Sequence, residues 1–164
     1  MSTEELIEVK TKPYGKIQVN PKQRIEFDEG LYGFENEKIF FLLDMEEEDG
    51  PFYYLQSGTS EELVFILINP YTFKKDFVLD IARGELKKLG ISNTKEDFED
   101  KILIFAIVTI PEDGSDITAN LLGPVVINVQ EQKGIQALSL VEGYATKHSI
   151  LKELDKMRND EGVA

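Results

Sequence analysis

Cysteine is absent from this 164-residue sequence, and histidine occurs once, as His148. Without cysteine the chain has no disulfide framework, no thiolate metal site and no cysteine nucleophile. A single histidine also excludes a metal site built from several imidazoles. Long hydrophobic runs are missing, because the longest ones, residues 63–68 and 102–108, are far shorter than a membrane span. The N-terminus lacks the apolar core of a signal peptide, so we expect a cytoplasmic protein without a membrane segment.

Basic residues are scarce as well. The chain has 18 Lys and Arg against 31 Asp and Glu, which gives a formal net charge of −13. Such a body repels phosphates, so we expect no direct binding to nucleic acid and partners that are basic or neutral. An acidic surface can also do no more than keep a protein soluble. Composition does not distinguish this interpretation from a role in binding basic or neutral partners.

Short runs with period-two alternation, or enriched in β-branched and aromatic residues, recur along most of the chain. Turn residues separate them, such as the Asp-Gly pairs and the Asn-Pro pairs. We predict a mainly β protein, a small antiparallel β-barrel-like single domain over residues 1–164. The predicted strands are residues 6–11, 16–19, 24–27, 38–45, 52–57, 63–68, 102–110, 117–121, 125–129 and 135–140.

The stretch from residue 116 to residue 128 reads DITANLLGPVVIN, and polar and turn residues interrupt its apolar run at Asn120, Gly123 and Pro124. Proline removes a ladder donor, and glycine frees the backbone. We therefore predict a bend at a sheet edge rather than one continuous central strand, with positive φ at Gly123.

Two segments have helical patterns. Residues 80–89 end at Gly90, which is typical of a glycine stop. Residues 146–157 carry an apolar stripe at helical spacing, formed by Ile150, Leu151, Leu154 and Met157. We expect this C-terminal helix to dock on the barrel or on a partner, and residues 159–164 to fray.

The sequence offers little material for catalysis. Ser57 lacks the flanking glycines of a nucleophile elbow, and His148 lies in the predicted C-terminal helix, where a solvated or capping role is the common one. We expect no enzymatic activity, no cofactor and no resident metal. An acidic ligand-binding barrel or a hydrolase with an unrecognised site stays open as the alternative.

Acidic and aromatic residues adjoin in the middle of the chain. Residues 44–49 hold five acids in a predicted hairpin turn, which is usually solvated and lacks the spacing of a calcium loop. Phe52, Tyr53 and Tyr54 follow directly. Strand alternation places Tyr53 on the face opposite Phe52 and Tyr54, so an aromatic faces outward unless both faces of the sheet are covered.

Six blocks of the sequence, in order, resemble the family of the flagellar assembly factor FliW. They cover residues from about 13 to 140, and the most specific are F-x-x-G-x-x-G-F-E, P-F-x-x-L-Q-S and N-L-x-x-P-x-x-I-N. The blocks read PYGKIQV, RIEFDEGLYGFE, PFYYLQS, LVFILINP, VTIPEDGSDITANLLGPVVIN and KGIQALSL.

This resemblance implies a non-enzymatic β-barrel protein with two protein partners, flagellin and CsrA, a small RNA-binding dimer that represses flagellin translation. Flagellin held in the cytoplasm would occupy the protein. Once flagellin is exported, the freed protein would bind CsrA away from its RNA-contacting surface and relieve the repression without competing for RNA. We expect a monomer in this role.

Candidate partner-binding residues follow from the aromatic and acidic clusters and from the family blocks. Aromatic anchors flanked by acids suit a partner with apolar and basic groups. The acids of the turn are expected to act through their field, which is screened by salt. The candidates are Tyr32, Phe34, Tyr53, Tyr54, Gln56, Glu46, Glu47, Glu48, Asn120 and Asn128.

Overall fold

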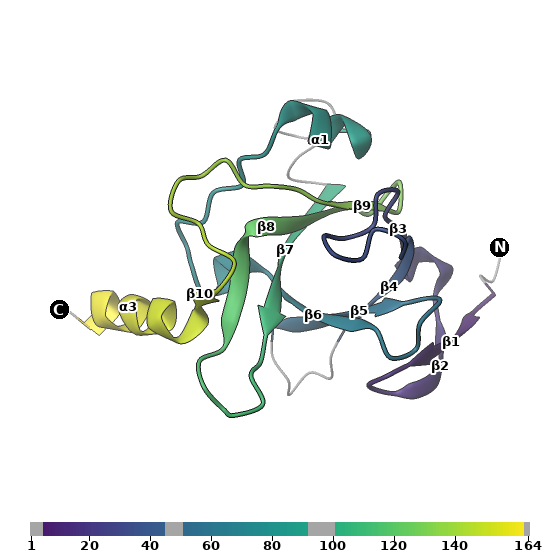
Figure 1. The fold of residues 1–164 in the computed structure, drawn as a ribbon, viewed down its shortest axis with the longest axis horizontal. Helices are drawn as coiled ribbons and strands as arrows, with labels where there is room; N and C mark the ends of the chain where they lie inside the picture. The colour runs from purple at the N-terminus through teal and green to yellow at the C-terminus, as the bar shows by residue number, and fades with distance from the viewer. Residues whose placement is uncertain (1–4, 45–50, 92–100, 163–164) are drawn as a thin grey trace.

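The structure is a computed structural model, and it describes residues 5–44, 51–91 and 101–162. Strands dominate these ranges (Figure 1). The strands are β1 (Ile7–Thr11), β2 (Gly15–Val19), β3 (Arg24–Glu26), β4 (Ile39–Asp44), β5 (Phe52–Ser57), β6 (Val64–Ile68), β7 (Ile102–Thr109), β8 (Thr118–Asn128), β9 (Lys133–Gln136) and β10 (His148–Ser149). Strands β1 to β7 and β9 lie within a few residues of predicted strands, whereas β8 joins two predicted strands and β10 falls in the predicted C-terminal helix.

Seven of the described strands close into a barrel. Their order is β8, β7, β6, β5, β4, β3 and β9, and β9 pairs back to β8. All these pairs are antiparallel except β3 with β9, which meet at Glu26 and Lys133. The Lys133 ammonium also donates to the Glu26 carboxylate at 2.9 Å. The predicted small, mainly β barrel is confirmed.

Strand β8 corrects the prediction of a sheet edge. It is continuous from Thr118 to Asn128 and lies between β7 on one side and β10, then β9, on the other. The predicted bend is present as a bulge. Phe105 of β7 pairs with Val125, and Ile107, two residues further along β7, pairs with Asn120, five residues away along β8. The backbone of Gly123 does not have positive φ. Glycine is needed there for space, since an added Cβ would lie 2.9 Å from the Gln136 amide nitrogen.

The hairpin of β1 and β2 lies against the outside of the barrel (Figure 1). Its inward side chains, Val9 and Val19, pack with Phe41 and Leu43 of β4 into a separate small core. The Lys12 amide, just after β1, donates to the Gln56 side chain of β5 at 3.0 Å. The hairpin therefore covers the outer face of β4 and β5.

In the described ranges, the α-helices α1 (Arg83–Lys88) and α3 (Ile150–Gly162) flank the barrel, as expected from the sequence. Helix α1 is shorter than predicted, and Gly90 after it has φ of 72°, which suits the predicted glycine stop. Helix α3 begins later than predicted and runs through residues 159–162, for which the sequence predicts a tail. No described helix is long and apolar enough to cross a membrane.

Helix α3 docks on the barrel by only part of its apolar stripe, and the alternative, docking on a partner, stays a prediction. Figure 1 shows the helix extending away from the barrel. Ile150 and Glu153 are buried, whereas Leu151 and Leu154 are 51% and 41% exposed. The helix is thus held at its first turns, and most of the predicted apolar stripe faces solvent. His148 precedes this helix in β10 and pairs with Ala119 of β8, so its predicted helical position is wrong.

Candidate protein-binding surface

One end of the barrel is covered by the loop between β3 and β4, which crosses the opening that faces the viewer in Figure 1. Two glycines with positive φ, Gly30 at 66° and Gly33 at 86°, fold this loop into a tight turn. Leu31 points into the barrel core and is fully buried. The turn therefore works as a plug, and its other side chains are left at the surface.

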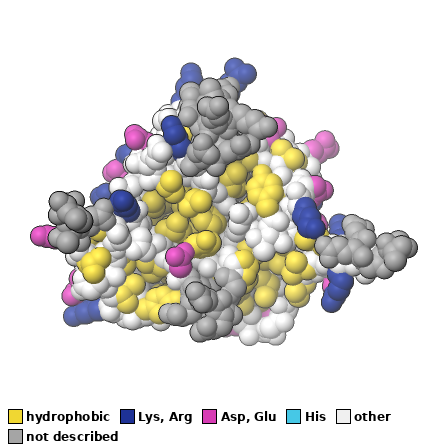
Figure 2. Space-filling view, turned by 180° about the vertical axis from the view of Figure 1, so that it is seen from behind, with side chains coloured by type: hydrophobic (Ala, Val, Ile, Leu, Met, Phe, Trp, Pro, Cys, Tyr) yellow, Lys and Arg dark blue, Asp and Glu magenta, His cyan; other side chains and the backbone are white. Residues whose placement is uncertain are grey.

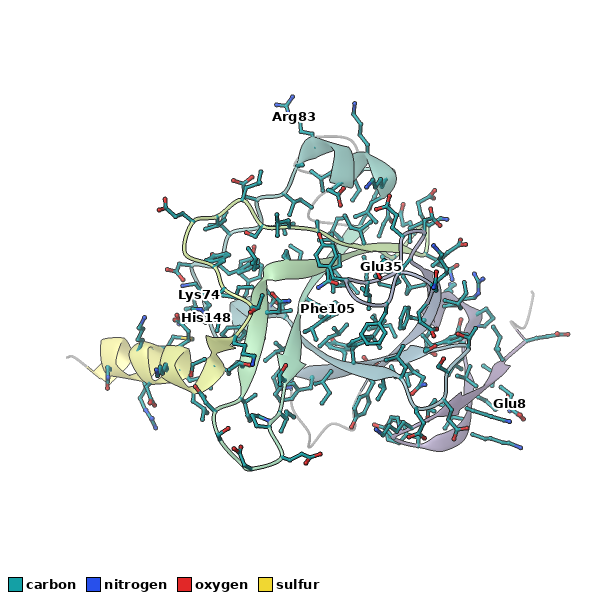
Figure 3. All side chains as sticks on the ribbon, in the orientation of Figure 1. Glu8, Glu35, Lys74, Arg83, Phe105 and His148 are labelled. Atoms are coloured by element: carbon teal, nitrogen blue, oxygen red, sulfur yellow. The ribbon has the colours of Figure 1, made fainter. Side chains whose placement is uncertain are left out.

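The two aromatic residues of the plug face outward. Tyr32 is 53% exposed and Phe34 is 39% exposed. The Phe34 ring packs edge-on against Phe65 of β6, with 5.3 Å between the ring centroids. Figure 3 shows Glu35 in the same loop, where its carboxylate accepts from the Gly33 amide at 3.0 Å. An exposed aromatic pair thus stands beside a carboxylate at one barrel end.

A buried amide fixes the position of Tyr32. The Gln136 side chain of β9 accepts from the Tyr32 amide at 2.9 Å and donates to the Gly123 carbonyl at 2.9 Å. The Gly123 amide in turn donates to the Asn120 side chain at 2.8 Å. This chain of bonds ties the plug to the bulge of β8, so Asn120 supports the surface from below. Nothing in the sequence pattern singled out Gln136 for this role.

Acidic residues border Tyr32 on the side of α1. Lys88 donates to Glu29 at 3.0 Å and to Glu85 at 2.8 Å, and so joins the helix to the plug. Burial and then the Glu85 carboxylate raise the pKa of the Tyr32 hydroxyl above its ordinary value. Like any tyrosine hydroxyl with a pKa of 10 or above, it is protonated at neutral pH and can donate a hydrogen bond to a partner. We call the set Tyr32, Phe34, Glu29, Glu35 and Glu85 the plug surface.

The other predicted aromatics do not join the plug surface. Tyr53 points into the barrel, where its ring lies 5.1 Å from the Phe105 ring. Tyr54 points outward but packs under the β1–β2 hairpin, with its ring 5.7 Å from that of Tyr14. Phe52 packs against the core beside β7 and β8. Both faces of β5 are covered, which is one of the two arrangements that the sequence left open.

Two of the predicted polar candidates are buried and fully engaged within the chain. Gln56 accepts from the Lys12 amide, and its amide nitrogen lies within 3.0–3.3 Å of four carbonyls of the β5–β6 turn. Asn128 donates to the Leu89 carbonyl at 2.7 Å and accepts from the Gln130 and Glu131 amides. These contacts stabilise the fold. Glu46, Glu47 and Glu48 lie outside the described residues.

The catalytic candidates are bonded to separate carboxylates. The Ser57 hydroxyl donates to Glu37 at 3.0 Å, and the His148 ring nitrogen lies 2.7 Å from the Glu153 carboxylate. Within the described part of the chain, no three His, Cys, Asp or Glu side chains gather in a way that could hold a metal ion. Ser57 and His148 are therefore not paired with each other as a nucleophile and its general base.

The base of α3 contains a charged cluster, whose members Lys74 and His148 are labelled close together in Figure 3. Glu153 lies 2.7 Å from His148, 3.6 Å from Lys74 and 3.8 Å from Lys156. Burial opposes its charged form, but the His148 hydrogen bond and the neighbouring lysines outweigh this effect. They lower the pKa of the Glu153 carboxyl below its ordinary value of 4.5.

This cluster predicts a loss of stability in acid. A carboxyl with a lowered folded pKa contributes stability above its unfolded pKa, and the contribution disappears as the pH falls through the folded pKa. We expect the free energy of unfolding of the wild type to fall more than that of Glu153→Gln between about pH 5 and pH 3. Urea unfolding across that range measures the difference, and parallel curves would contradict it.

Apolar side chains also reach the surface elsewhere. Figure 2 shows the opposite face, where hydrophobic patches lie between charged side chains. The backbone of the plug surface is fixed by two features. The Gln136 side chain accepts from the Tyr32 amide, and Gly30 and Gly33 adopt the positive φ angles that the tight turn requires. Rigid aromatic anchors of this kind are typical of protein contact sites.

The described residues form a small closed β-barrel that carries exposed, acid-flanked aromatic side chains at one end. A family model described as "FliW protein" matches residues 8–150, and the chain belongs to this family of flagellar assembly factors. The ordered blocks of the sequence had predicted the same family.

Relatives and a solved structure agree with this assignment. The chain is 42% identical over 149 residues to "Flagellar assembly factor FliW" of Treponema denticola, which covers 91% of this chain and 97% of that protein. It is 42% identical over 147 residues to the protein of the same description from Leptospira interrogans, covering 89% and 94%. A crystal structure of the flagellar assembly factor FliW superposes with a TM-score of 0.76 at 34% identity, covering 88% of this chain and 96% of that one.

Proposed function

We propose that this protein is a non-enzymatic, cytoplasmic regulator of flagellar assembly that acts as a monomer and binds flagellin and CsrA in turn. While flagellin is abundant in the cell, it occupies the protein. After export has removed flagellin, the free protein binds CsrA and antagonises it without competing for RNA, so that flagellin translation resumes.

The plug surface carries this proposal. Its exposed aromatic residues, Tyr32 and Phe34, supply apolar contact area. Their backbone is already held in place, so little conformational entropy is lost on binding. Its flanking carboxylates suit a partner with basic groups, as an RNA-binding protein has. The net charge of −13 also disfavours RNA beside a bound complex, within a Debye length of roughly 8 Å.

Truncation of the two aromatics tests the proposal. We expect Tyr32→Ala and Phe34→Ala each to weaken binding to flagellin or to CsrA by about thirtyfold, because a central aromatic anchor contributes about 2 kcal/mol. Isothermal titration calorimetry with purified flagellin and CsrA measures this effect.

Tyr71→Ala is the matched control. Tyr71 is similarly exposed, but it packs on Phe77 in a different cluster, so its loss should leave both affinities unchanged. If both plug variants fold and bind like the wild type, the plug surface is the wrong site. If the wild type binds neither flagellin nor CsrA, the proposed function itself is wrong.

A further inference from the structure

The outer edge of β1 is bordered by a groove. Strand β1 pairs only with β2 in the described part of the chain, so its other edge carries backbone groups with no strand beside them. A groove of about 680 Å³ runs along this edge, and four consecutive residues of β1, from Ile7 to Lys10, line it. No residue of β2 lines it. An unpaired strand edge is a template for another extended chain.

The floor and the far wall of the groove belong to the barrel. Ile39 and Phe41 of β4 form an apolar floor, and residues 57–59 form the wall opposite β1. The wall comes so close to the floor that a Cβ on Gly58 would lie 3.0 Å from the Phe41 ring. The groove is therefore a slot with one strand edge, an apolar base and a wall from the β5–β6 turn, and the charged residues Arg24 and Glu61 line it as well.

The wall is held in place by one carboxylate. Glu37 accepts hydrogen bonds from the hydroxyls of Ser57, Thr59 and Ser60, at 3.0, 2.6 and 2.9 Å. The hydroxyls of Thr59, then Ser60, lower the pKa of the Glu37 carboxyl, because their hydrogen bonds favour its charged form. The slot is thus preformed, and an incoming segment does not have to open it.

The side chains of β1 define what would fit. Ile7 and Val9 point toward the barrel, whereas Glu8 and Lys10 are exposed on the other face, and Figure 3 shows Glu8 pointing outward. In an antiparallel pair, directly opposite residues lie on the same face, and opposite charges there stabilise the pairing. A matching segment therefore has apolar residues over the floor, a cation opposite Glu8 and an acid opposite Lys10.

We propose that this slot binds an extended segment of a partner protein, which adds to β1 as an antiparallel strand with that alternation of apolar and charged residues. Main-chain hydrogen bonds supply the affinity and the alternate side chains supply the specificity. A single extended segment fits better than a second copy of this chain. A strand in the slot lies between β1 and residues 57–59, whereas the β1 of a second copy would bring its own paired β2 into the space of that wall.

The proposal does not depend on flagellin or CsrA, and a synthetic peptide tests it. A capped peptide with the sequence LIEVKT copies residues 6–11, and its antiparallel pairing with β1 at Val9 places its Lys opposite Glu8 and its Glu opposite Lys10. Titration of the isotope-labelled full chain to millimolar peptide, followed by NMR, should shift the amides of residues 7–11 and 57–59. The amides of the plug surface should not shift.

A charge exchange provides the matched control. In the double variant Glu8→Lys with Lys10→Glu, both cross-strand pairs become repulsive, so the dissociation constant for LIEVKT should rise about fivefold or more. The peptide LIKVET should restore binding to this variant. The proposal is overturned if LIEVKT shifts no groove amide, or if the double variant binds LIEVKT as tightly as the wild type.

Discussion

Replacement of Gly30 with alanine is expected to destabilise the protein by about 3 kcal/mol, the sum of backbone strain and overpacking. Gly30 is buried and has φ of 66°, a conformation that L-residues rarely adopt. An added Cβ would also lie 2.4 Å from the Phe34 carbonyl oxygen and 2.7 Å from the Glu35 Cα. Since both neighbours are backbone, the plug itself has to move.

Gly33→Ala is the control for this prediction. Gly33 lies in the same turn at φ of 86°, but no atom lies within 4 Å of the position of its Cβ. Only backbone strain remains, so we expect a loss of about 1 kcal/mol. Urea unfolding of the two variants measures the difference. Equal losses would show that the close approach of the backbone in the plug has no energetic consequence.

Local patterns predicted the barrel strands because their causes are local. The alternation at residues 52–57 and the β-branched run that ends at Ile68 coincide with β5 and β6. Gly90 marked the end of α1 for an equally local reason, since its positive φ is part of the helix stop. Features of this kind depend on neighbours within a few residues.

The C-terminal helix was predicted correctly, but the central place of β8 in the sheet and the packing of α3 were not, because distant residues decide them. Pro124 suggested a sheet edge, yet β8 changes its partner from β10 to β9 across the bulge and remains central. In α3, the Glu153 carboxylate contacts His148 and Lys74. The Glu153 side chain therefore faces the body of the protein, while Leu151 faces solvent. Ile150 also packs into an apolar cluster on the barrel, so the first turn of α3 docks through both apolar and charged contacts with distant segments.

The candidate site residues also fall into two groups, those placed by local structure and those placed by distant contacts. Tyr32 and Phe34 lie in a glycine turn, and a turn on a surface exposes its side chains, so these two candidates are accessible to a partner. Tyr54 and Gln56 belong to a neighbouring family block but are covered by the β1–β2 hairpin. Which strand face a hairpin covers depends on contacts about 40 residues apart in sequence, and alternation alone does not contain that information.

Gln136→Leu should separate the support of the plug surface from general stability. The change keeps a similar volume but leaves the Tyr32 amide and the Gly123 carbonyl without their partner. An unpaired buried polar group costs about 1–3 kcal/mol, so we expect a loss of about 3 kcal/mol in the free energy of unfolding. We also expect faster hydrogen exchange at the Tyr32 amide and weaker partner binding, because the plug loses its anchor.

Gln56→Leu is the control, since it removes an equally buried amide that serves the β1–β2 hairpin instead. This variant should lose comparable stability and show faster exchange at the Lys12 amide, whose bond to Gln56 is removed, while exchange at Tyr32 stays unchanged. Hydrogen exchange followed by NMR, with urea unfolding of both variants, distinguishes the two effects. If Gln136→Leu changed stability by less than about 0.5 kcal/mol, or left exchange at Tyr32 unchanged, the buried amide would not be what positions the aromatic anchor. The plug would then be held by its two glycines and by Leu31 in the barrel core.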